Sequence, residues 1–337
     1  MKGWKLTKPF ELEEQEIIEK EEVGTTKIKL TKALISLADV LRFNGEIDCD
    51  SIILGSSGIG IISDTEANLF GLEKGKRVYV NANKFCEECY ECKSGDRNSC
   101  SNLLKAGEDY DGFLRDFIST DSNEIFILPD SVHDLEALFI EQISLATEVV
   151  DKLNIQAGDY VSIIGANNFG NILAQLLIYY QAVPIVLTNN AEDYKIAKES
   201  GIYYVLNQED NWQKEVSSIT SGRMTKSVVY IADCNISATK AFALASHNAG
   251  VAFTGISYKN TPIPFSQAIK KQLNIRCIDN GFKNTASSIN LIANKAIDLS
   301  HLKIDTISYS EVPKKLKEMS SALEKEESVR ETIVELI

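Results

Sequence analysis

The chain contains the stretch Asp159-Tyr-Val-Ser-Ile-Ile-Gly165-Ala-Asn-Asn-Phe-Gly170-Asn-Ile-Leu-Ala-Gln-Leu-Leu-Ile-Tyr-Tyr. It begins with an apolar run of strand length, passes through a glycine-containing turn and ends in a segment with an apolar helical face. Further strands are expected at Val183-Pro-Ile-Val-Leu, Ser227-Val-Val-Tyr-Ile-Ala and Gly250-Val-Ala-Phe-Thr-Gly255, with a helix at Asp193-Tyr-Lys-Ile-Ala-Lys. This alternation runs from about residue 152 to about residue 288 and predicts an α/β fold, in which helices cover both faces of a parallel sheet.

The turn Gly165-Ala-Asn-Asn-Phe-Gly170 has the position and the outer glycines of a dinucleotide-binding fingerprint, G-x-G-x-x-G. In that pattern the middle glycine lets the backbone approach a pyrophosphate at the helix N-terminus. Here Asn167 replaces the middle glycine. The candidate cofactor-binding residues are Gly165, Asn167, Asn168, Phe169, Gly170 and Asn189.

Asn189 stands at the end of the second expected strand, where such folds normally carry an Asp or Glu for the ribose hydroxyls of the adenosine. A neutral amide can still hydrogen-bond a ribose, and it does not repel a 2′-phosphate. Because no arginine stands beside it to bind that phosphate, the sequence leaves the choice between NAD and NADP open.

Four cysteines form a second motif, with the spacing C-x2-C-x2-C-x7-C at Cys86, Cys89, Cys92 and Cys100. A compact loop with this spacing can deliver four thiolates to a tetrahedral zinc ion. Because all four positions are then held by protein, the spacing predicts one structural zinc per chain. The alternative is a set of disulfides or unrelated free thiols.

The segments outside the alternating region are expected to be β-rich. Short apolar runs at Ile52-Ile-Leu, Gly60-Ile-Ile and Arg77-Val-Tyr-Val are separated by Gly, Asn and Asp, which is typical of strands and turns. The tail from Ser310 predicts a charged amphipathic helix, followed by a closing strand at residues 332–337. We find no internal repeat and no low-complexity linker.

Composition indicates a globular protein of about two domains, with 337 residues, 44% hydrophobic and 25% charged. The formal net charge of −13 disfavours nucleic acid and anionic membranes as partners, because both are negative themselves. The start, Met1-Lys-Gly-Trp-Lys-Leu, is expected not to be a signal peptide, and no membrane span is predicted. The remaining cysteines, Cys49, Cys234 and Cys277, are expected to be reduced, which favours the cytoplasm.

Together these features resemble the medium-chain, zinc-containing alcohol and polyol dehydrogenase family. The resemblance follows the family's order through the segments around Asp39 and Gly55, the cysteine motif, Asp111-Gly-Phe-Leu-Arg-Asp and Leu128-Pro-Asp. It implies a GroES-like substrate domain at residues 1–151 and 289–337, with a structural zinc lobe at about 84–102. It also implies a doubly wound Rossmann domain at residues 152–288, an active site in the cleft between the domains, and a homodimer or homotetramer paired through the Rossmann sheets.

The family's catalytic zinc ligands are not all present. Ser36 stands at the position of the first ligand, a cysteine, and Ser56 at that of the second, a histidine; only Glu141 keeps a ligating side chain at the third. Ala38 and Leu41 stand where the family's proton relay has a hydroxyl and a histidine. Because hydroxyls are poor zinc ligands beside thiolate and imidazole, the sequence predicts that the catalytic zinc is lost.

Other residues offer no replacement ligand set. His133, His247 and His301 form no ligand-like pair, and Cys49 is more simply a packing residue. Asp39 and Glu141 also have a plainer interpretation, as hydrogen-bonded or ion-paired carboxylates. The sequence does not distinguish that interpretation from an acid/base role.

Three functional hypotheses remain, because a catalytic zinc normally contributes several kcal/mol to stabilising the developing charge. The first is a metal-independent NAD(P) oxidoreductase that acts on a small carbonyl or conjugated substrate, with Ser36, Ser56 and Glu141 as candidate catalytic residues. The second is a catalytically inactive, dinucleotide-binding regulatory or partner subunit. The third is an interaction module that keeps only the fold.

Overall fold

The computed structural model describes residues 2–17, 25–48, 50–65, 71–207, 210–256 and 260–336. Contacts divide the chain into two compact units, Met1–Ile140 with Ile304–Ile337, and Glu141–Lys303. The sequence divides the chain after residues 151 and 288 instead. Helices α4 (Ile140–Lys152) and α10 (Thr285–Ala293) meet within the second unit, where the hydroxyl oxygens of Ser144 and Ser288 lie 2.9 Å apart. Which functions the two domains carry stays a prediction.

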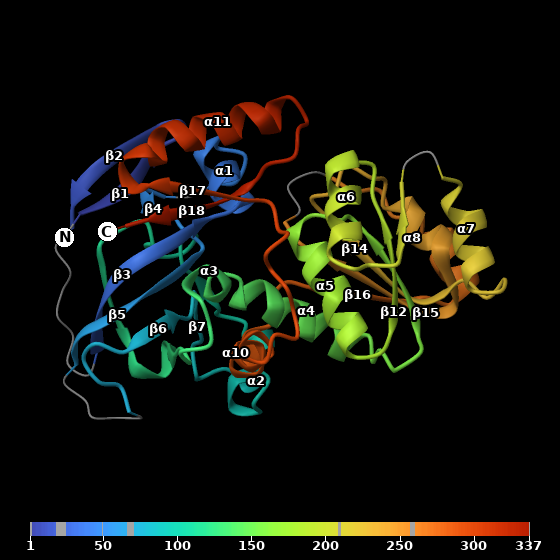
Figure 1. Ribbon diagram of the computed structural model, residues 1–337, viewed down its shortest axis with the longest axis horizontal. Coiled ribbons are helices and arrows are strands. Elements are labelled where there is room, and N and C mark those ends of the chain that lie inside the picture. The colour runs from blue at the N-terminus through green and yellow to red at the C-terminus, as the bar shows by residue number, and fades with distance from the viewer. Residues whose placement is uncertain are drawn as a thin grey trace. The chain divides into compact units, whose positions relative to one another are not determined.

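The first unit is built round a seven-stranded sheet of order β10-β6-β5-β3-β18-β17, in which β9 also pairs with β3 (Figure 1). Its strands are β3 (Thr25–Ile35), β5 (Ser57–Thr65), β6 (Arg77–Val80), β9 (Phe117–Asp121), β10 (Ile125–Ile127), β17 (Ile304–Ser308) and β18 (Glu331–Glu335). The pairing of Ile333 with Leu34 brings β18 against β3 in antiparallel register. The end of the chain therefore completes a sheet that starts near its beginning, which confirms the predicted closing strand.

Two smaller sheets belong to the same unit, one of order β2-β1-β4 and one that pairs β7 with β8. Their strands are β1 (Lys2–Lys8), β2 (Glu11–Glu16), β4 (Ile52–Ile53), β7 (Asn83–Lys84) and β8 (Leu104–Lys105). The helices are α1 (Leu37–Phe43), α2 (Tyr90–Lys93), α3 (Asp134–Ala137) and α11 (Val312–Glu324), with 3₁₀ turns η1 (Arg97–Ser99), η2 (Ser122–Glu124) and η4 (Tyr309–Glu311). Helix α11 buries Val312, Leu316 and Met319 in the core, which confirms the predicted amphipathic helix.

The second unit contains a six-stranded, wholly parallel sheet of order β13-β12-β11-β14-β15-β16. Its strands are β11 (Tyr160–Ile164), β12 (Val183–Leu187), β13 (Tyr204–Leu206), β14 (Thr225–Ile231), β15 (Ala245–Thr254) and β16 (Asn274–Ile278). Its further helices are α5 (Asn168–Tyr179), α6 (Ala191–Glu199), α7 (Trp212–Ile219), α8 (Thr239–Leu244) and α9 (Phe265–Lys271), with the turn η3 (Phe282–Asn284). Counted along the chain, the strand order is 3-2-1-4-5-6, the doubly wound order of a Rossmann fold. The predicted fold class is therefore confirmed.

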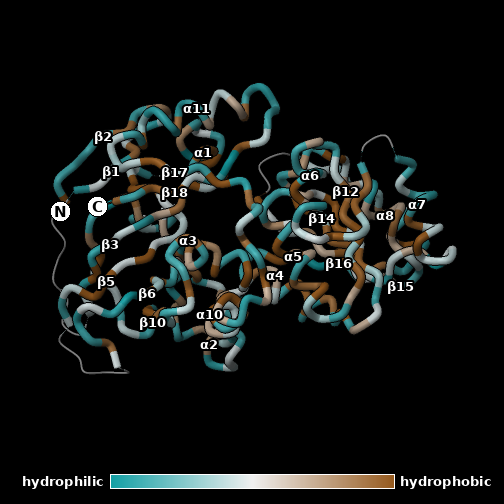
Figure 2. Tube along the Cα trace, viewed as in Figure 1, coloured by the Kyte–Doolittle hydropathy of each residue, from teal (hydrophilic) through white to brown (hydrophobic). Residues whose placement is uncertain are grey.

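The central strands of this sheet are covered on both faces. Hydrophobic residues gather along β12 and β14 in Figure 2, and Val216, Phe242 and Ala268 of the surrounding helices pack against them. Strands buried in this way appear in a sequence as continuous apolar runs. No helix in the described parts of the chain is both long enough and apolar enough to cross a membrane.

Candidate functional site

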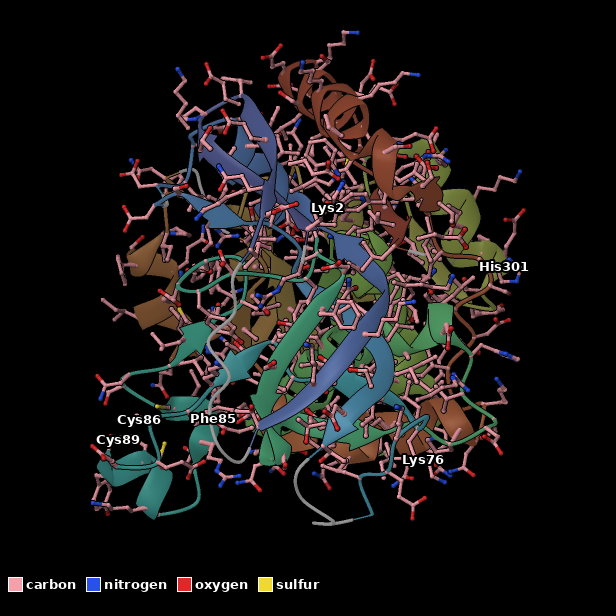
Figure 3. The ribbon with its side chains drawn as sticks, turned by 90° about the vertical axis from the view of Figure 1, so that its left-hand side faces the viewer. Lys2, Lys76, Phe85, Cys86, Cys89 and His301 are labelled. Atoms are coloured by element: carbon pink, nitrogen blue, oxygen red, sulfur yellow. The ribbon has the colours of Figure 1, made fainter. Side chains whose placement is uncertain are left out.

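The cysteine motif forms a lobe between β7 and β8 in the first unit. Strands β7 and β8 pair antiparallel, with Lys84 opposite Leu104, so the first and last residues of the lobe lie side by side. Inside the lobe, α2 begins after Cys89, and η1 leads directly into Cys100. Figure 3 shows Cys86 and Cys89 on this lobe, at the surface of the unit.

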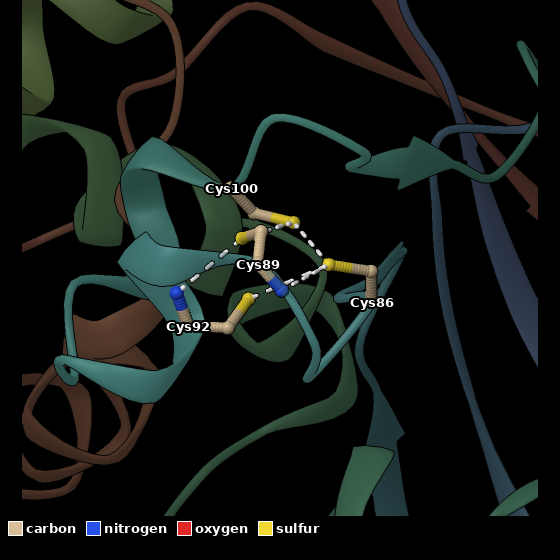
Figure 4. Close-up of side chains that lie close together, drawn as sticks. All are labelled: Cys86, Cys89, Cys92 and Cys100. Atoms are coloured by element: carbon tan, nitrogen blue, oxygen red, sulfur yellow. Dashed lines mark hydrogen bonds between the residues drawn. The ribbon is translucent and has the colours of Figure 1, made fainter.

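The four thiols of the lobe converge on one point (Figure 4). All four Sγ atoms lie within 4.8 Å of one another, with Cys86–Cys92 and Cys89–Cys100 at 4.0 Å and Cys86–Cys100 at 3.6 Å. Zinc–sulfur bonds of about 2.3 Å in a tetrahedron place the sulfurs about 3.8 Å apart. The spacing therefore fits a metal ion, and it is too wide for a disulfide, whose sulfurs lie about 2.05 Å apart. The geometry disfavours the disulfide alternative.

Backbone N–H groups in the lobe point at sulfur. The N–H of Cys89 donates to Sγ of Cys86 at 3.3 Å, and the N–H of Cys92 donates to Sγ of Cys89 at 3.4 Å. Hydrogen bonds from the backbone of Glu88 and Cys89 lower the pKa of Cys86 to about 6, whereas burial raises the pKa of Cys92 to about 12. Cys86 is thus more readily converted than Cys92 to the thiolate that a metal binds.

Asp39 connects the two segments that carry Ser36 and Ser56. Its Oδ2 accepts hydrogen bonds from the N–H and the hydroxyl of Ser36 at 2.8 and 3.2 Å, and its Oδ1 accepts one from the N–H of Gly55 at 2.7 Å. Asp39 is fully buried, and burial raises its pKa, although these donors and the Arg42 charge lower it. The carboxylate is therefore used to hold backbone, as in the plainer interpretation of Asp39.

The structure brings the Ser36 and Ser56 segments together round Asp39, and Ser56 is half-buried with its N–H bonded to the carbonyl of Leu34. Glu141 is half-buried in the first turn of α4, in the other unit. Cys49 lies outside the described residues. Among the described residues, the four cysteines form the only group of three or more His, Cys, Asp or Glu side chains that lie close enough to bind one metal ion.

The glycine turn has the geometry of a nucleotide-binding loop at its first and last positions. Gly165 has φ of +110°, a region that strongly favours glycine. A Cβ on Gly170 would lie 2.3 Å from the carbonyl oxygen of Gly165, so only glycine fits there without movement of the backbone. The loop therefore turns sharply and holds the start of α5 against the end of β11, as the fingerprint requires.

Asn167, the residue in place of the middle glycine, is held by hydrogen bonds within the chain. Its Oδ1 accepts from the N–H of Gly170 at 3.0 Å and caps α5, and its Nδ2 donates to Oδ2 of Asp233 at 2.9 Å. Burial raises the pKa of Asp233, and the hydrogen bond from Asn167 lowers it.

The next two candidates face the protein. Asn168 is buried, with Oδ1 accepting from the N–H of Lys303 at 2.8 Å and Nδ2 donating to the Lys303 carbonyl at 3.0 Å. Phe169 is also buried. Their side chains therefore position α5, and only their backbone is available to meet a phosphate.

Asn189 lines a cavity of about 550 Å³ at the carboxyl edge of the sheet. Its Nδ2 donates to the carbonyl of Asn235 at 2.7 Å. The start of α7 and one side of α8 line the same cavity, where Lys240 lies over the Trp212 ring with its Nζ 5.6 Å from the ring centroid. The lining is mixed, because the apolar Trp212, Ile236, Ala243 and Leu244 alternate with amides and with the charged Asp210 and Lys240. Convergent polar groups beside an aromatic ring can orient a small molecule.

Sequence reasoning misses two charged residues at this edge. Asp233 directly follows the predicted strand at residues 227–232, which places it at the carboxyl edge of the sheet, but no local pattern pairs it with the glycine turn. Lys303 is nearly buried, and its Nζ lies 2.7 Å from Asp193 and 3.0 Å from Glu192. No local pattern marks Lys303, because its partners lie far away in the chain.

Two family models match the chain. Residues 22–130 match the alcohol dehydrogenase GroES-like domain, and residues 169–294 match a zinc-binding dehydrogenase model. Among similar proteins, an uncharacterised zinc-type alcohol dehydrogenase-like protein of Haemophilus influenzae is 27% identical over 271 residues, 80% of this chain and 79% of that protein. The starvation-sensing protein RspB of Escherichia coli is 27% identical over 285 residues, 82% of each chain.

Solved structures resemble the whole chain. An Escherichia coli alcohol dehydrogenase, RspB, in complex with NADH has a TM-score of 0.87 at 23% identity, over 100% of this chain and 99% of that one. A zinc-binding dehydrogenase of Sinorhizobium meliloti bound to NADP has a TM-score of 0.85 at 19% identity, over 99% of both chains. At these identities the likeness shows the fold.

Proposed function

This chain belongs to the medium-chain, zinc-containing alcohol and polyol dehydrogenase family, and from that premise we propose that it is an NAD(P)-dependent oxidoreductase without a catalytic zinc. Its reaction is hydride transfer to or from a small carbonyl or conjugated substrate. The observation that carries the proposal is the glycine turn between β11 and α5 in a sheet of Rossmann order. Relatives solved with NADH and with NADP support this choice of cofactor.

A nicotinamide dinucleotide, when bound, supplies the hydride. The residues of this chain bind and orient it. The first turn of α5 offers backbone N–H groups to the pyrophosphate, and the cavity beside Asn189 accepts the adenosine half. Asn189 Oδ1 can accept a hydrogen bond from a ribose hydroxyl, and Lys240 on the same cavity can meet a 2′-phosphate. We therefore propose that NAD and NADP bind with little preference between them.

Zinc is proposed for the cysteine lobe alone, one ion per chain. Cys86, Cys89, Cys92 and Cys100 have the donor chemistry and the separations that a tetrahedral site needs. With four protein ligands the ion would have no open position for a substrate. Its part is then to hold the lobe folded.

The family's second zinc does not fit this chain. Ser36 and Ser56 offer hydroxyls in place of thiolate and imidazole, and the Ser36 hydroxyl already donates to Asp39. Charge that develops on a substrate oxygen must then be met by hydrogen bonds, or spread over the substrate itself. We propose Ser56 as a donor, Ser36 as a second donor once its hydroxyl is released from Asp39, and Glu141 as the acid/base residue.

The proposed partners are a small-molecule substrate and further copies of this chain, as a homodimer or homotetramer. Strand β16 is the last strand of the sheet and pairs only with β15 among the described strands. It leaves Ile275 and Cys277 exposed. An exposed, partly apolar edge strand is a template for pairing with a second copy. Nucleic acid, a membrane surface and any location outside the cytoplasm stay disfavoured by the acidic charge and the reduced cysteines.

Titration with NADH and NADPH, followed by calorimetry and by nicotinamide fluorescence, tests the proposal. Binding of both in the micromolar to millimolar range is expected. A screen of ketones, aldehydes and conjugated enones with NADPH and NADH then measures turnover, with and without a chelator that spares the cysteine lobe. Activity that requires added zinc would contradict the metal-independent mechanism.

A second candidate is a dinucleotide-binding subunit without catalysis. It is favoured by two internal hydrogen bonds, from Asn167 to Asp233 and from Ser36 to Asp39. They occupy side chains that would otherwise face the pyrophosphate and the catalytic metal. Tight dinucleotide binding with no turnover in the screen would support it. If neither NADH nor NADPH binds, the result supports the third hypothesis, an interaction module that keeps only the fold.

A further inference from the structure

Asn167 and Asp233 join two loops at the switch point of the parallel sheet. Asn167 follows β11 and Asp233 follows β14, and these two strands are neighbours, with Ile164 opposite Tyr230. In open α/β sheets the ligand binds outside the carboxyl ends of the strands at this point. The 2.9 Å hydrogen bond from Asn167 Nδ2 to Asp233 Oδ2, here called the Asn167–Asp233 bridge, therefore lies at the end of the sheet where such folds bind a dinucleotide.

The loops that the bridge joins are in close contact. A Cβ on Gly165 would lie 3.1 Å from the Cβ atoms of Cys234 and Ile231, and one on Gly255 would lie 3.0 Å from Oδ1 of Asp233. The Asp233 carboxylate thus has one oxygen on Asn167 and the other against the turn after β15. It is held at the switch point from two sides.

The bridge holds a carboxylate beside the N-terminus of α5, the part of a Rossmann fold that binds a pyrophosphate. The N-terminus of α5 attracts negative charge, because its backbone dipoles leave partial positive charge there. Asn167 caps this end with its Oδ1 and holds Asp233 with its Nδ2. Burial and the charge of Asp193, at the start of α6, raise the pKa of Asp233, whereas the hydrogen bond from Asn167 lowers it. Lys303 offsets the charge of Asp193 through a 2.7 Å ion pair.

We propose that the Asn167–Asp233 bridge is a built-in competitor of the pyrophosphate, so that Asp233 sets the affinity of this chain for dinucleotides. The inference rests on the proposed function, because it concerns the same cofactor. It differs from a plain loss of the middle glycine. If the missing glycine alone weakens binding, only the bulk of Asn167 opposes the pyrophosphate, and the charge of Asp233 has no effect on the affinity for dinucleotides.

Neutral variants of Asp233 separate these two explanations. Asp233→Asn keeps an oxygen for Asn167 and removes the charge, and Asp233→Ser is a second neutral replacement should the first fold poorly. Asp159→Asn is the matched control, because it removes one negative charge from the opposite end of β11, where Asp159 pairs with Lys226 at 3.0 Å. Thermal unfolding of each variant checks that it is folded.

The dissociation constants for adenosine, ADP and NADH are then measured by calorimetry at pH 8. Asp233→Asn is expected to tighten ADP and NADH at least about tenfold and to change adenosine, which has no phosphate, less than about twofold. Asp159→Asn is expected to change none of the three. Unchanged ADP and NADH affinity in both Asp233 variants, or equal tightening of adenosine, overturns the inference.

The outcomes also separate this inference from the proposed function. If wild-type protein binds NADH and the Asp233 variants bind it no more tightly, the competitor inference is refuted and the oxidoreductase proposal is unaffected. Wild-type protein that fails to bind, beside an Asp233 variant that binds, supports the competitor and contradicts a dinucleotide-dependent activity. Failure of both proteins to bind NADH refutes both ideas.

Discussion

Glu124, the last residue of η2, offers a test of the electrostatics that connect the cysteine lobe to the sheet. Its Oε2 accepts a 2.7 Å hydrogen bond from Nδ2 of Asn81, and its backbone carbonyl accepts one from the N–H of Asn81. Burial raises the pKa of Glu124 from 4.5 to about 7, whereas the Asn81 hydrogen bond and the charge of Arg97 in the lobe lower it. We expect Glu124→Gln to stabilise the protein at alkaline pH, because glutamine keeps an acceptor for Asn81 and carries no charge.

The size of the effect follows from the two pKa values. Because the folded-state pKa lies above the unfolded one, the folded protein holds this proton more tightly. The stability gained is fully present below pH 4.5 and is lost as the pH rises through about 7. At about 1.4 kcal/mol for each pH unit, the difference corresponds to about 3 kcal/mol. Contact of the half-buried side chain with water reduces this, so the glutamine variant should gain about 1–3 kcal/mol at pH 8 and almost nothing at pH 4.5.

The assay is urea unfolding from pH 4.5 to 8, followed by tryptophan fluorescence. Trp4 belongs to the first unit and Trp212 to the second, so a Trp212→Phe background makes the signal report the unit that contains Glu124. Glu73→Gln, at an exposed turn of the same unit, is the control and should give a small difference that does not change with pH. Equal stability of wild type and Glu124→Gln at pH 8, or a pH-independent difference, would refute the reasoning.

Four further predictions concern the metal, the turn, catalysis and assembly. Elemental analysis should find about one zinc per chain, and Cys89→Ser should lower both zinc content and the unfolding temperature without a specific loss of turnover. Two zincs per chain would contradict the proposal that the catalytic zinc is lost. Gly170→Ala should cost about 1–3 kcal/mol in urea unfolding, because the new Cβ meets the backbone carbonyl of Gly165 at 2.3 Å; an unchanged midpoint would show that the turn relaxes. Glu141→Gln should depress turnover of any substrate found in the screen and flatten its pH profile, whereas a structural remnant would leave the rate unchanged. Ile275→Asp should shift sedimentation from dimer or tetramer to monomer, and a retained oligomer would move the interface away from β16.

The parallel sheet could be predicted because its central strands are buried on both faces. Strands β11 and β12 consist almost wholly of apolar residues in runs of five, and each is followed by a turn residue and an amphipathic helix. The shorter strand β13 and the edge strand β16 were not predicted. Strand β13 has three residues, and β16 is exposed over most of its length, so neither carries the continuous apolar run that marks a buried strand.

The hairpin of β1 and β2 could not be predicted from local preference, because β2 is rich in glutamate, which is depleted in strands. Pairing across the strands decides this structure. Lys5 lies opposite Glu13, Lys2 opposite Glu16, and Leu6 opposite Leu12. Opposite charges in facing positions contribute roughly 0.2–1 kcal/mol for each pair, but only after the register is known.

The candidate sites divide in the same way. The cysteine cluster could be predicted because all four ligands lie within one short loop, whose spacing fixes how closely they approach. The Asp233 partner of Asn167 lies 66 residues away, on the loop of another strand, so only the folded sheet brings it to the glycine turn. Likewise, the hydrogen bond between Asp39 and the N–H of Gly55 depends on the path of the backbone just before β5, which no local motif specifies.

Ser36, at the position of a catalytic zinc ligand, and Asn167, at the position of the middle glycine, share a feature that bears on the choice among the three functional hypotheses. At each one, polar groups that a ligand would otherwise meet are bonded within the chain: the Ser36 hydroxyl to Asp39, and Asn167 to both Gly170 and Asp233. A fully buried polar group left without a partner costs about 1–3 kcal/mol. Ser36 and Asn167 are half-buried, so these contacts remove part of such a penalty from an empty site. A ligand must therefore displace internal hydrogen bonds and gains only the difference. Such sites favour weak, exchangeable binding over a tightly held cofactor. The intact geometry of Gly165 and Gly170 in turn favours a chain that still admits a dinucleotide over one that keeps only the fold.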